Sequence, residues 1–236
     1  MKAMRILAIE TSCDETACAV VEDGTKIVSS VVASSTKMHE KYGGIVPEVA
    51  AREQLKCIIP VITEALSGSG LEKRKGKTPL DTIDAIAVTI GPGLIGSLLV
   101  GVETAKTLAF VTGNPIIPVN HVLAHMYANF VDSSFVIPGL IRNPSSFSTG
   151  SRLGGRDDKK KIQFPAISLV VSGGHTELYL MKSTKDLTWL GGTLDDAAGE
   201  CFDKTARLLG FGSQGGVAIQ EAARSYHVSD IAYHPQ

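Results

Sequence analysis

The sequence lacks the marks of a disulfide-stabilised, membrane-spanning or broadly basic protein. Its four cysteines, Cys13, Cys18, Cys57 and Cys201, form no CxxC pair, which indicates free thiols in a reducing compartment. No apolar run approaches the length of a membrane span, and the opening "MKAMRILAIETS" is interrupted by Glu10 and has no small-residue cleavage site. The net charge of −1 leaves room only for a local nucleic-acid-binding patch. These absences predict a cytoplasmic protein that does not enter a membrane.

The order of apolar runs and turn residues predicts an α/β fold. Three strands open the chain ("RILAIETS", "TACAVVEDG" and "KIVSSVVASS"), and a helix should follow from about Pro47 to Leu66. Pro60 lies inside this helix and predicts a kink or a break. "IDAIAVTI" then reads as a buried strand that ends in the glycine-rich "GPGLIGS", a turn that opens a second helix through "LLVGVETAKTLAFVTG". "NPIIPVN" predicts a further strand, which leads directly into a helix.

The second half restarts the pattern of the first. Residues 132–163 carry six Lys or Arg against three Asp and few periodic apolar positions, which indicates a flexible basic insertion. A solvated linker is the favoured interpretation of this insertion over an RNA-contacting arm. The next stretch, "PAISLVVSGGHTELYLMKS", repeats the layout of "RILAIETSCDETACAVVEDG" as strand, small polar turn and strand. Two such hairpins suggest an internally duplicated fold.

Two motifs in the first half carry side chains that could bind a metal or position a substrate. In "NHVLAHM", His121 and His125 would share one face of a helix, close enough for one metal ion, although two core residues remain an alternative. "ETSCDET" gathers three acids in a single strand-connecting turn, and acids there could hold Mg²⁺ or position a polar substrate. A solvated turn is the simpler alternative for this second motif.

Three further motifs in the second half suggest contacts to an anion or a sugar. In "VSGGHT", the adjacent Gly173 and Gly174 would let backbone N–H groups approach an anion, but a tight hairpin turn explains them as well. In "DDAAGECFDKTARLLG", the helical spacing surrounds Asp203 with apolar residues. This predicts a half-buried carboxylate instead of an ordinary surface acid. "GSQGG", residues 212–216, reads as a permissive turn where a sugar or base could approach.

Taken together, "ETSCDET", "GPGLIGSLLVG", "NHVLAH", "VSGGHTEL" and "DDAAGECFDKTARLLG" occur in the order and spacing of one family. The chain resembles the tRNA threonylcarbamoyltransferases, the TsaD-type proteins related to the KEOPS catalytic subunit and formerly called O-sialoglycoprotein endopeptidases. The resemblance covers about residues 1–131 and 164–224. It implies an actin-like ATPase fold of two duplicated RNase H-like halves, here 1–120 and 121–236, with the second half incomplete.

The resemblance also implies a reaction, a metal and partners. The reaction is the transfer of a threonylcarbamoyl group from threonylcarbamoyl-adenylate to N6 of adenosine 37 in tRNAs that read ANN codons. His121 and His125 would hold one Fe²⁺ per chain, or Zn²⁺ or another divalent ion, which would act as a Lewis acid. Asp14 and Glu15 would be catalytic positioning groups. The partners would be tRNA, a TsaB-type paralogue and a TsaE-type ATPase.

By the same resemblance, the adenylate would lie against the glycine turn and the helix that follows it. The residues implied to bind it are Val170, Val171, Ser172, Gly173, Gly174, Asp203 and Gly216. Asp203 and Gly216 would contact its ribose.

Two departures from the family pattern bear on activity. Val217 stands where the family usually has a proline after the glycine pair, and nothing after Arg224 matches the family's adenylate-binding asparagine or its aspartate metal ligand. We therefore expect a chain truncated at its C-terminal side, with weak and largely open metal coordination. Two alternatives remain: a catalytically inactive actin-fold scaffold or pseudo-enzyme, and a sugar kinase or other ATPase of the same superfamily.

Overall fold

The computed structural model describes residues 3–42, 44–70, 78–131, 162–212 and 215–224. The chain divides into two compact units, Met1–Arg156 and Asp157–Gln236, and each is described here by itself. This division differs from the one expected after residue 120, because the helix that begins at His121 contacts the last two strands of the first unit's sheet. The expected insertion at 132–163 lies almost wholly outside the described residues.

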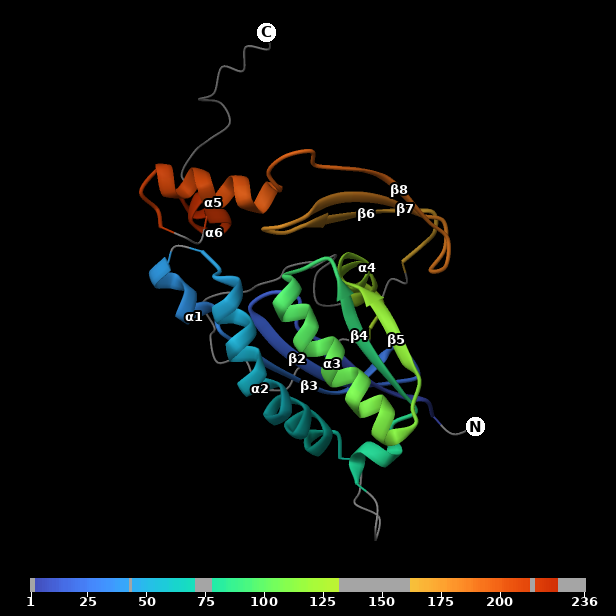
Figure 1. Ribbon diagram of the computed structural model, residues 1–236. Helices are drawn as coiled ribbons and strands as arrows, with labels where there is room; N and C mark the ends of the chain where they lie inside the picture. The colour runs from blue at the N-terminus through green and yellow to red at the C-terminus, as the bar shows by residue number, and fades with distance from the viewer. Residues whose placement is uncertain (1–2, 43, 71–77, 132–161, 213–214, 225–236) are drawn as a thin grey trace. The chain divides into compact units, whose positions relative to one another are not determined.

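The first unit is a five-stranded mixed sheet in the order β3-β2-β1-β4-β5 (Figure 1). β1, β2 and β3 form an antiparallel meander, and β4 and β5 join it in parallel to β1. The elements are β1 (Arg5–Glu10), β2 (Glu15–Glu22), β3 (Lys26–Ser34), α1 (Thr36–His39), α2 (Pro47–Gly68), β4 (Ala85–Gly91), α3 (Ile95–Thr112), β5 (Ile116–Asn120) and α4 (His121–Tyr127). The five strands and three of the helices match the order predicted from the sequence, while the short α1 was not predicted.

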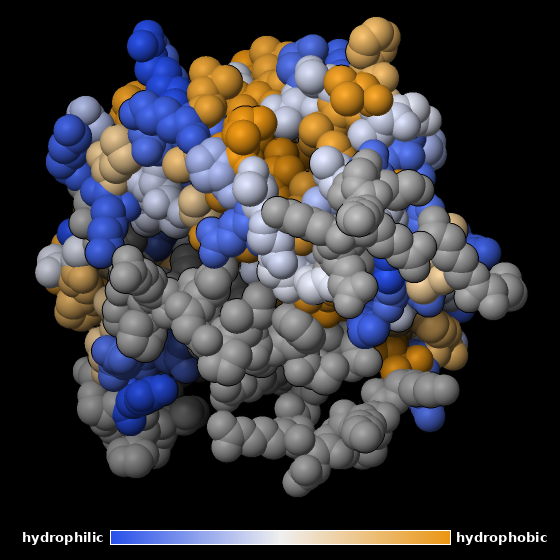
Figure 2. Space-filling view, turned by 90° about the horizontal axis from the view of Figure 1, so that it is seen from below, coloured by the Kyte–Doolittle hydropathy of each residue, from blue (hydrophilic) through white to orange (hydrophobic). Residues whose placement is uncertain are grey.

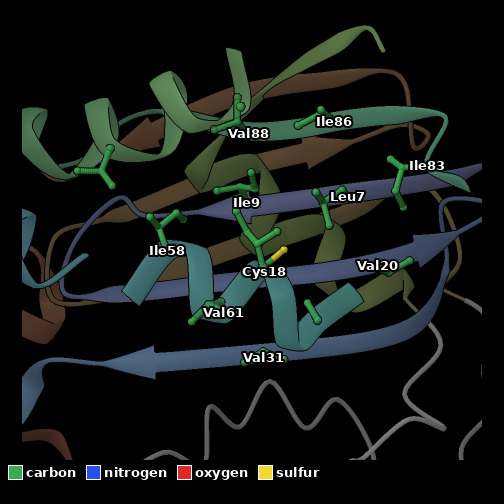
Figure 3. Packing of buried hydrophobic residues seen from close by; sticks show 14 residues of the cluster. Leu7, Ile9, Cys18, Val20, Val31, Ile58, Val61, Ile83, Ile86 and Val88 are labelled. Atoms are coloured by element: carbon green, nitrogen blue, oxygen red, sulfur yellow. The ribbon is translucent and has the colours of Figure 1, made fainter. Parts of the chain in front are cut away.

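The core of the first unit lies where α2 and α3 cover one face of this sheet. Alternate residues of β1, Leu7 and Ile9, are buried there against Ile58 and Val61 of α2 and Val88 of β4 (Figure 3). Burying a side chain of this size contributes roughly 1.5–3 kcal/mol to stability. The period-two pattern of β1 and the helical period of α2 therefore meet in one hydrophobic layer.

Helix α2 begins at Pro47, as predicted, and runs through Pro60 without the break that was considered. Proline suits the first helical turn because its missing N–H would have no partner there. Pro60 is exposed, so the carbonyl of Lys56, four residues earlier, can be hydrated on the outer side of the helix. Its position on the exposed face explains why the helix continues.

Helix α3 corrects the expectation that no segment is long and apolar enough for a membrane span. By length and composition alone, Ile95–Thr112 passes that test. It nevertheless packs on β4 and α2 and buries Ser97, Val100, Gly101 and Ala105 in the first unit. Exposed hydrophobic side chains also occur elsewhere on the molecule, and Figure 2 shows a face where they gather beside hydrophilic ones. Only 22% of this segment is buried, so packing within the unit accounts for part of its apolar character.

The second unit contains a three-stranded antiparallel sheet, in the order β6-β7-β8, and two helices that pack on each other. The elements are β6 (Ala166–Val171), β7 (Thr176–Met181), β8 (Leu187–Gly192), α5 (Ala198–Leu208) and α6 (Gly215–Ala223). The β6–β7 hairpin and α5 were predicted, whereas β8 and α6 were not. The sequence pattern of "GSQGG" was misread in part, because Gly215 and Gly216 open a helix instead of extending a turn.

Both units begin with the same antiparallel meander of three strands, which is the duplication that the sequence suggested (Figure 1). The first unit adds two parallel strands to its meander, and the described part of the second adds none. The expected α/β class is confirmed, and the repeated meander agrees with the expected duplication.

Candidate functional site

In the first unit, polar side chains meet where three neighbouring parallel strands end. Glu10 ends β1, Thr89 lies near the end of β4, and His121 follows the last residue of β5. Parallel strands present their carboxyl ends at one edge of a sheet, so residues distant in sequence come together there. The Oε2 atom of Glu10 accepts a hydrogen bond from the hydroxyl of Thr89 and lies 3.3 Å from Nδ1 of His121.

The two histidines lie on one face of α4, as their spacing predicted. Val122 and Met126 are buried under the helix, which turns His121 and His125 outward. The side chain of Asn120 caps the helix by accepting the N–H of Leu123. The two Nε2 atoms are 3.1 Å apart, and the rings are nearly perpendicular at 83°.

Glu10 orients the ring of His121 through a contact to Nδ1. Burial raises the pKa of Glu10, but hydrogen bonds from His121, Ser12 and Thr89 outweigh it and lower that pKa to about 2. An ionised carboxylate beside Nδ1 favours the tautomer with its proton on Nδ1, which leaves the lone pair on Nε2. The hydroxyl of Ser12, 3.1 Å from Nδ1, supports the same orientation.

This geometry fits a divalent metal ion held by two imidazoles. Two nitrogens bound to one ion at about 2.1 Å, at angles from a right angle to tetrahedral, lie about 3.0–3.4 Å apart. The observed separation of 3.1 Å falls in that range. A carboxylate on the far nitrogen of a ligating histidine is the usual outer-shell support. Among the described residues, no cluster of three or more His, Cys, Asp or Glu side chains completes such a site.

The loop between β1 and β2 is held by hydrogen bonds from α2 and by close packing against the turn that precedes α3. The buried amide of Gln54 on α2 donates to the carbonyls of Thr11, Cys13 and Glu15. The carbonyl of Ser12 accepts from the N–H of Leu94, and a Cβ placed on Gly93 would lie 2.5 Å from that carbonyl. The glycine-rich turn before α3 therefore packs closely against this loop.

Asp14 and Glu15, the acids singled out in the sequence, do not join the histidine pair among the described contacts. The Oδ2 atom of Asp14 accepts a hydrogen bond from the hydroxyl of Thr36 at 2.7 Å, and its carbonyl accepts from Ser35. Partial removal from water and the charges of Asp14 and Glu10 raise the pKa of Glu15. The acid that contacts His121 is Glu10, which the sequence analysis did not select.

In the second unit, the glycine turn between β6 and β7 lies against the start of α5. Val170 and Val171 end β6, and the hydroxyl of Ser172 accepts the N–H groups of Gly174 and His175. The N–H of Gly199 donates to the carbonyl of Ser172 at 3.1 Å, and a Cβ on Gly199 would lie 2.5 Å from that oxygen. Gly199 is a further residue that the sequence analysis missed, because its role appears only in this contact.

Asp203 lies one helical turn beyond Gly199 on α5 and is half-buried, as predicted. Its Oδ1 atom accepts the N–H of Gly215 at 2.9 Å and so ties α5 to the start of α6, where Gly216 follows. A Cβ on Gly215 would lie 2.3 Å from the carbonyl of Phe202, so only glycine fits there. Asp196 and Glu200 pair instead with Lys204 on the surface.

A family model and the curated relatives point to the same family over most of this chain. The family model for tRNA N6-adenosine threonylcarbamoyltransferase, TsaD, matches residues 26–141 and 152–235. The chain is 50% identical over 220 residues to the threonylcarbamoyltransferase of Thermomicrobium roseum, covering 93% of this chain and 53% of that protein. It is 44% identical to that of Persephonella marina, covering 94% and 54%. The chain thus spans about half the length of the curated relatives it matches.

Solved structures match this chain with low sequence identity and with TM-scores below 0.5. YeaZ from Pseudomonas aeruginosa matches with a TM-score of 0.41 and 14% identity, over 79% of this chain and 66% of that one. The ethanolamine utilization protein EutJ from Carboxydothermus hydrogenoformans matches with a TM-score of 0.44 and 10% identity, over 97% and 75%.

Proposed function

Because the chain belongs to the tRNA N6-adenosine threonylcarbamoyltransferase family, we propose that it provides the histidine-bearing part of an enzyme that forms threonylcarbamoyladenosine in tRNA. The reaction would transfer the threonylcarbamoyl group from threonylcarbamoyl-adenylate to N6 of adenosine 37 in tRNAs that read ANN codons. The single observation that carries this proposal is the His121–His125 pair, with Nε2 atoms 3.1 Å apart and Glu10 on the far nitrogen of His121.

In this proposal His121 and His125 hold one Fe²⁺, with Zn²⁺ or another divalent ion as the alternative. The bound ion would supply Lewis-acid polarisation of the carbamoyl oxygen. Glu10 keeps the proton of His121 on Nδ1 and so keeps Nε2 available. Ser12 and Gln54 hold the loop that positions Glu10, and Asp14 and Glu15 are proposed to orient substrate from the same loop.

The second unit is proposed to bind the adenylate. Val170, Val171, Ser172, Gly173 and Gly174 would contact it through the turn that follows β6. Asp203 and Gly216 would contact its ribose, and the Asp203–Gly215 hydrogen bond supports this by holding the carboxylate at the start of α6.

The partners proposed are tRNA, a TsaB-type paralogue and a TsaE-type ATPase, in the cytoplasm. A protein partner is supported by hydrophobic side chains left exposed on the two helices that cover the first sheet. These are Leu55 and Ile59 on α2, and Ile95, Leu99 and Phe110 on α3. Large exposed apolar groups on neighbouring helices are typical of protein interfaces.

A second candidate is a catalytically inactive scaffold or pseudo-enzyme of the same fold. The observation that favours it is that no third His, Cys, Asp or Glu ligand joins the histidine pair within the described part of the chain. Two imidazoles alone would bind a divalent ion weakly and leave most of its coordination open.

One experiment separates the two candidates. The purified chain is loaded with Fe²⁺ or Zn²⁺, the metal is quantified, and transfer from threonylcarbamoyl-adenylate to unmodified tRNA is assayed with both partner proteins present. The enzyme proposal expects transfer that disappears in His121→Ala and His125→Ala and persists in Glu48→Ala, which removes only an exposed ion pair with Arg52. Folded protein that gives no transfer in any condition would contradict transfer by this chain with those partners and would favour the scaffold.

A further inference from the structure

A small cavity with a largely polar wall lies within the first unit. Its volume is about 50 Å³, and residues of the β1–β2 loop, β2, β3, α1 and α2 line it. The lining residues that carry oxygen in their side chains are Asp14, Thr16, Ser34, Ser35, Glu53 and Gln54. One water needs about 10–15 Å³ of such space, so the cavity has room for a small ion together with water. The two histidines of α4 do not line it, so the cavity is separate from the candidate metal centre.

The amide of Gln54 is buried in this wall and is only half satisfied. The residue is 1% exposed, and its Nε2 atom donates to three carbonyls of the β1–β2 loop and the start of β2. The two ends of an amide diverge, so Oε1 is turned away from those carbonyls. Oε1 has no hydrogen-bond partner among the described residues. Acceptors buried in this way are rare in folded proteins, and each one marks a place where a donor or a cation belongs.

Two carboxylates face the same cavity, and Asp14 has no cationic partner in the described part of the chain. Its Oδ2 atom accepts the hydroxyl of Thr36 at 2.7 Å, which is a neutral donor. Glu53 pairs with Lys56, whose side chain is 68% exposed and therefore lies at the surface. Exposed ion pairs are strongly hydrated and contribute little, so most of the negative charge of the wall is left without compensation.

The two thiols nearest these carboxylates respond to the same negative charge. Burial, with the charge of Asp14 second, raises the pKa of Cys13 to about 11. Burial, with the charge of Glu53 second, raises the pKa of Cys57, which itself lines the cavity. A protonated thiol is a poor metal ligand, so the donors that the cavity offers are oxygens.

Oxygen donors with two carboxylates are the ligands of a hard divalent cation. Mg²⁺ is usually bound through one or two carboxylates and keeps several of its waters, which matches both the donors and the volume of this cavity. Zn²⁺ and other softer ions prefer nitrogen and sulfur. A bare cation is smaller than a water molecule, so it can approach the Oε1 atom of Gln54, which has almost no surface open to water.

We propose that this cavity is a second cation site, which binds one hard divalent cation of the Mg²⁺ type through Asp14, Glu53 and the Oε1 atom of Gln54, together with waters that the ion retains. The cation would join the β1–β2 loop to α2. The inference goes beyond the proposed transfer activity and does not depend on it. Because Asp14 also has a proposed role with substrate, the test varies Glu53.

The test titrates the metal-free chain with Mg²⁺ by calorimetry, without nucleotide or tRNA. A second chain that carries His121→Ala and His125→Ala is titrated in the same way, so that the histidine pair cannot contribute. We expect each to bind one Mg²⁺, and Glu53→Gln to weaken this binding at least about tenfold because a carboxylate ligand is lost. Glu48→Gln makes the same change in the exposed first turn of α2 and is the matched control, which should bind Mg²⁺ as the unsubstituted chain does.

Mn²⁺, which is paramagnetic and can replace Mg²⁺, locates the site in the chain without the two histidines. The amide signals of Thr16, Ser35 and Gln54 should broaden in NMR spectra at lower Mn²⁺ concentrations than those of β4. The proposal is overturned if the folded chain does not bind Mg²⁺, if binding disappears with the histidines, or if Glu53→Gln and Glu48→Gln bind equally. Broadening centred on other residues would also overturn it.

Discussion

Glu10 shows how a single side chain links the first unit's sheet to its candidate metal centre. It ends β1, lies beside Thr89 of β4 and contacts His121 after β5, so one carboxylate joins three strand ends. Reading along the sequence, the acids of "ETSCDET" look alike, and Asp14 and Glu15 were expected to be positioning groups because of the family resemblance. The distinguishing signal was available, since among these acids only Glu10 lies at the end of the buried strand β1. Acids at that position share an edge with residues that follow other parallel strands.

Replacing Glu10 by glutamine should weaken metal binding by the histidine pair. Outer-shell carboxylates typically contribute about 10–100-fold to metal affinity, and Glu10→Gln would remove the charge that holds the proton on Nδ1 of His121. Titration with Zn²⁺ or Co²⁺ measures the affinity. Glu22→Gln is the control, because Glu22 pairs with Arg5 and Lys26 away from the histidines. Equal affinities in the two variants would show that Glu10 does not support the site.

The cysteines should react in an order set by burial. Burial, with the charge of Asp14 second, raises the pKa of Cys13 to about 11, and burial raises that of Cys18 to about 12. At pH 8 only about one in a thousand Cys13 thiols would then be a thiolate, which is the reactive form. Iodoacetamide should label the exposed Cys201 first, and labelling of Cys13 should rise about tenfold per pH unit between 8 and 10. Mass spectrometry of the peptides checks this, and rapid labelling of Cys13 at pH 8 would contradict it.

At the scale of elements, close packing between α3 and the β1–β2 loop decides how firmly the candidate site is held. Gly101 faces the buried Thr11, whose hydroxyl donates to the carbonyl of Ser97 on the same helix. A Cβ on Gly101 would lie 2.4 Å from that hydroxyl oxygen, whereas one on Gly96 would lie 3.3 Å from the side chain of Ala51. The same substitution at two glycines of one helix therefore has different steric consequences.

Gly101→Ala should lower the free energy of unfolding by about 1–3 kcal/mol, the usual cost of overpacking a core. Gly96→Ala should cost clearly less, because the neighbouring methyl group can shift by a few tenths of an ångström and alanine favours a helix over glycine by about 1 kcal/mol. Denaturant titration of both variants gives the comparison. Equal destabilisation would mean that the loop yields to the added methyl group.

At the scale of the whole molecule, the sequence predicted the elements with strong periodicity and missed those that depend on tertiary contact. β1 to β5 and α2 to α4 were recognised from their apolar runs and from the turn residues between them. β8 was missed because "LTWLGG" has no alternation and its strand form depends on pairing with β7. Gly215 and Gly216 were read as a turn because glycines disfavour helices, yet Gly215 is required by its contact with Phe202 and capped by Asp203. The His121–His125 pair was predicted from spacing alone, while its support by Glu10 needed the sheet.

The two units should differ in stability because only the first has a layered core in the described structure. The hydrophobic side chains that are buried in the second unit are Val170, Met181, Ala197 and Ala206. Because so few large apolar side chains are buried there, burial contributes little free energy to the described part of the second unit.

Hydrogen exchange of the chain alone should therefore show two levels of protection. Amides of β1, β2 and β4 should exchange only through global opening of the first unit, while those of β6 to β8 should exchange at least about a hundredfold faster through local opening. Denaturant should release the second unit first, and the variant Gly101→Ala should shift only the later transition. A single transition in which both sheets lose protection together would contradict this expectation.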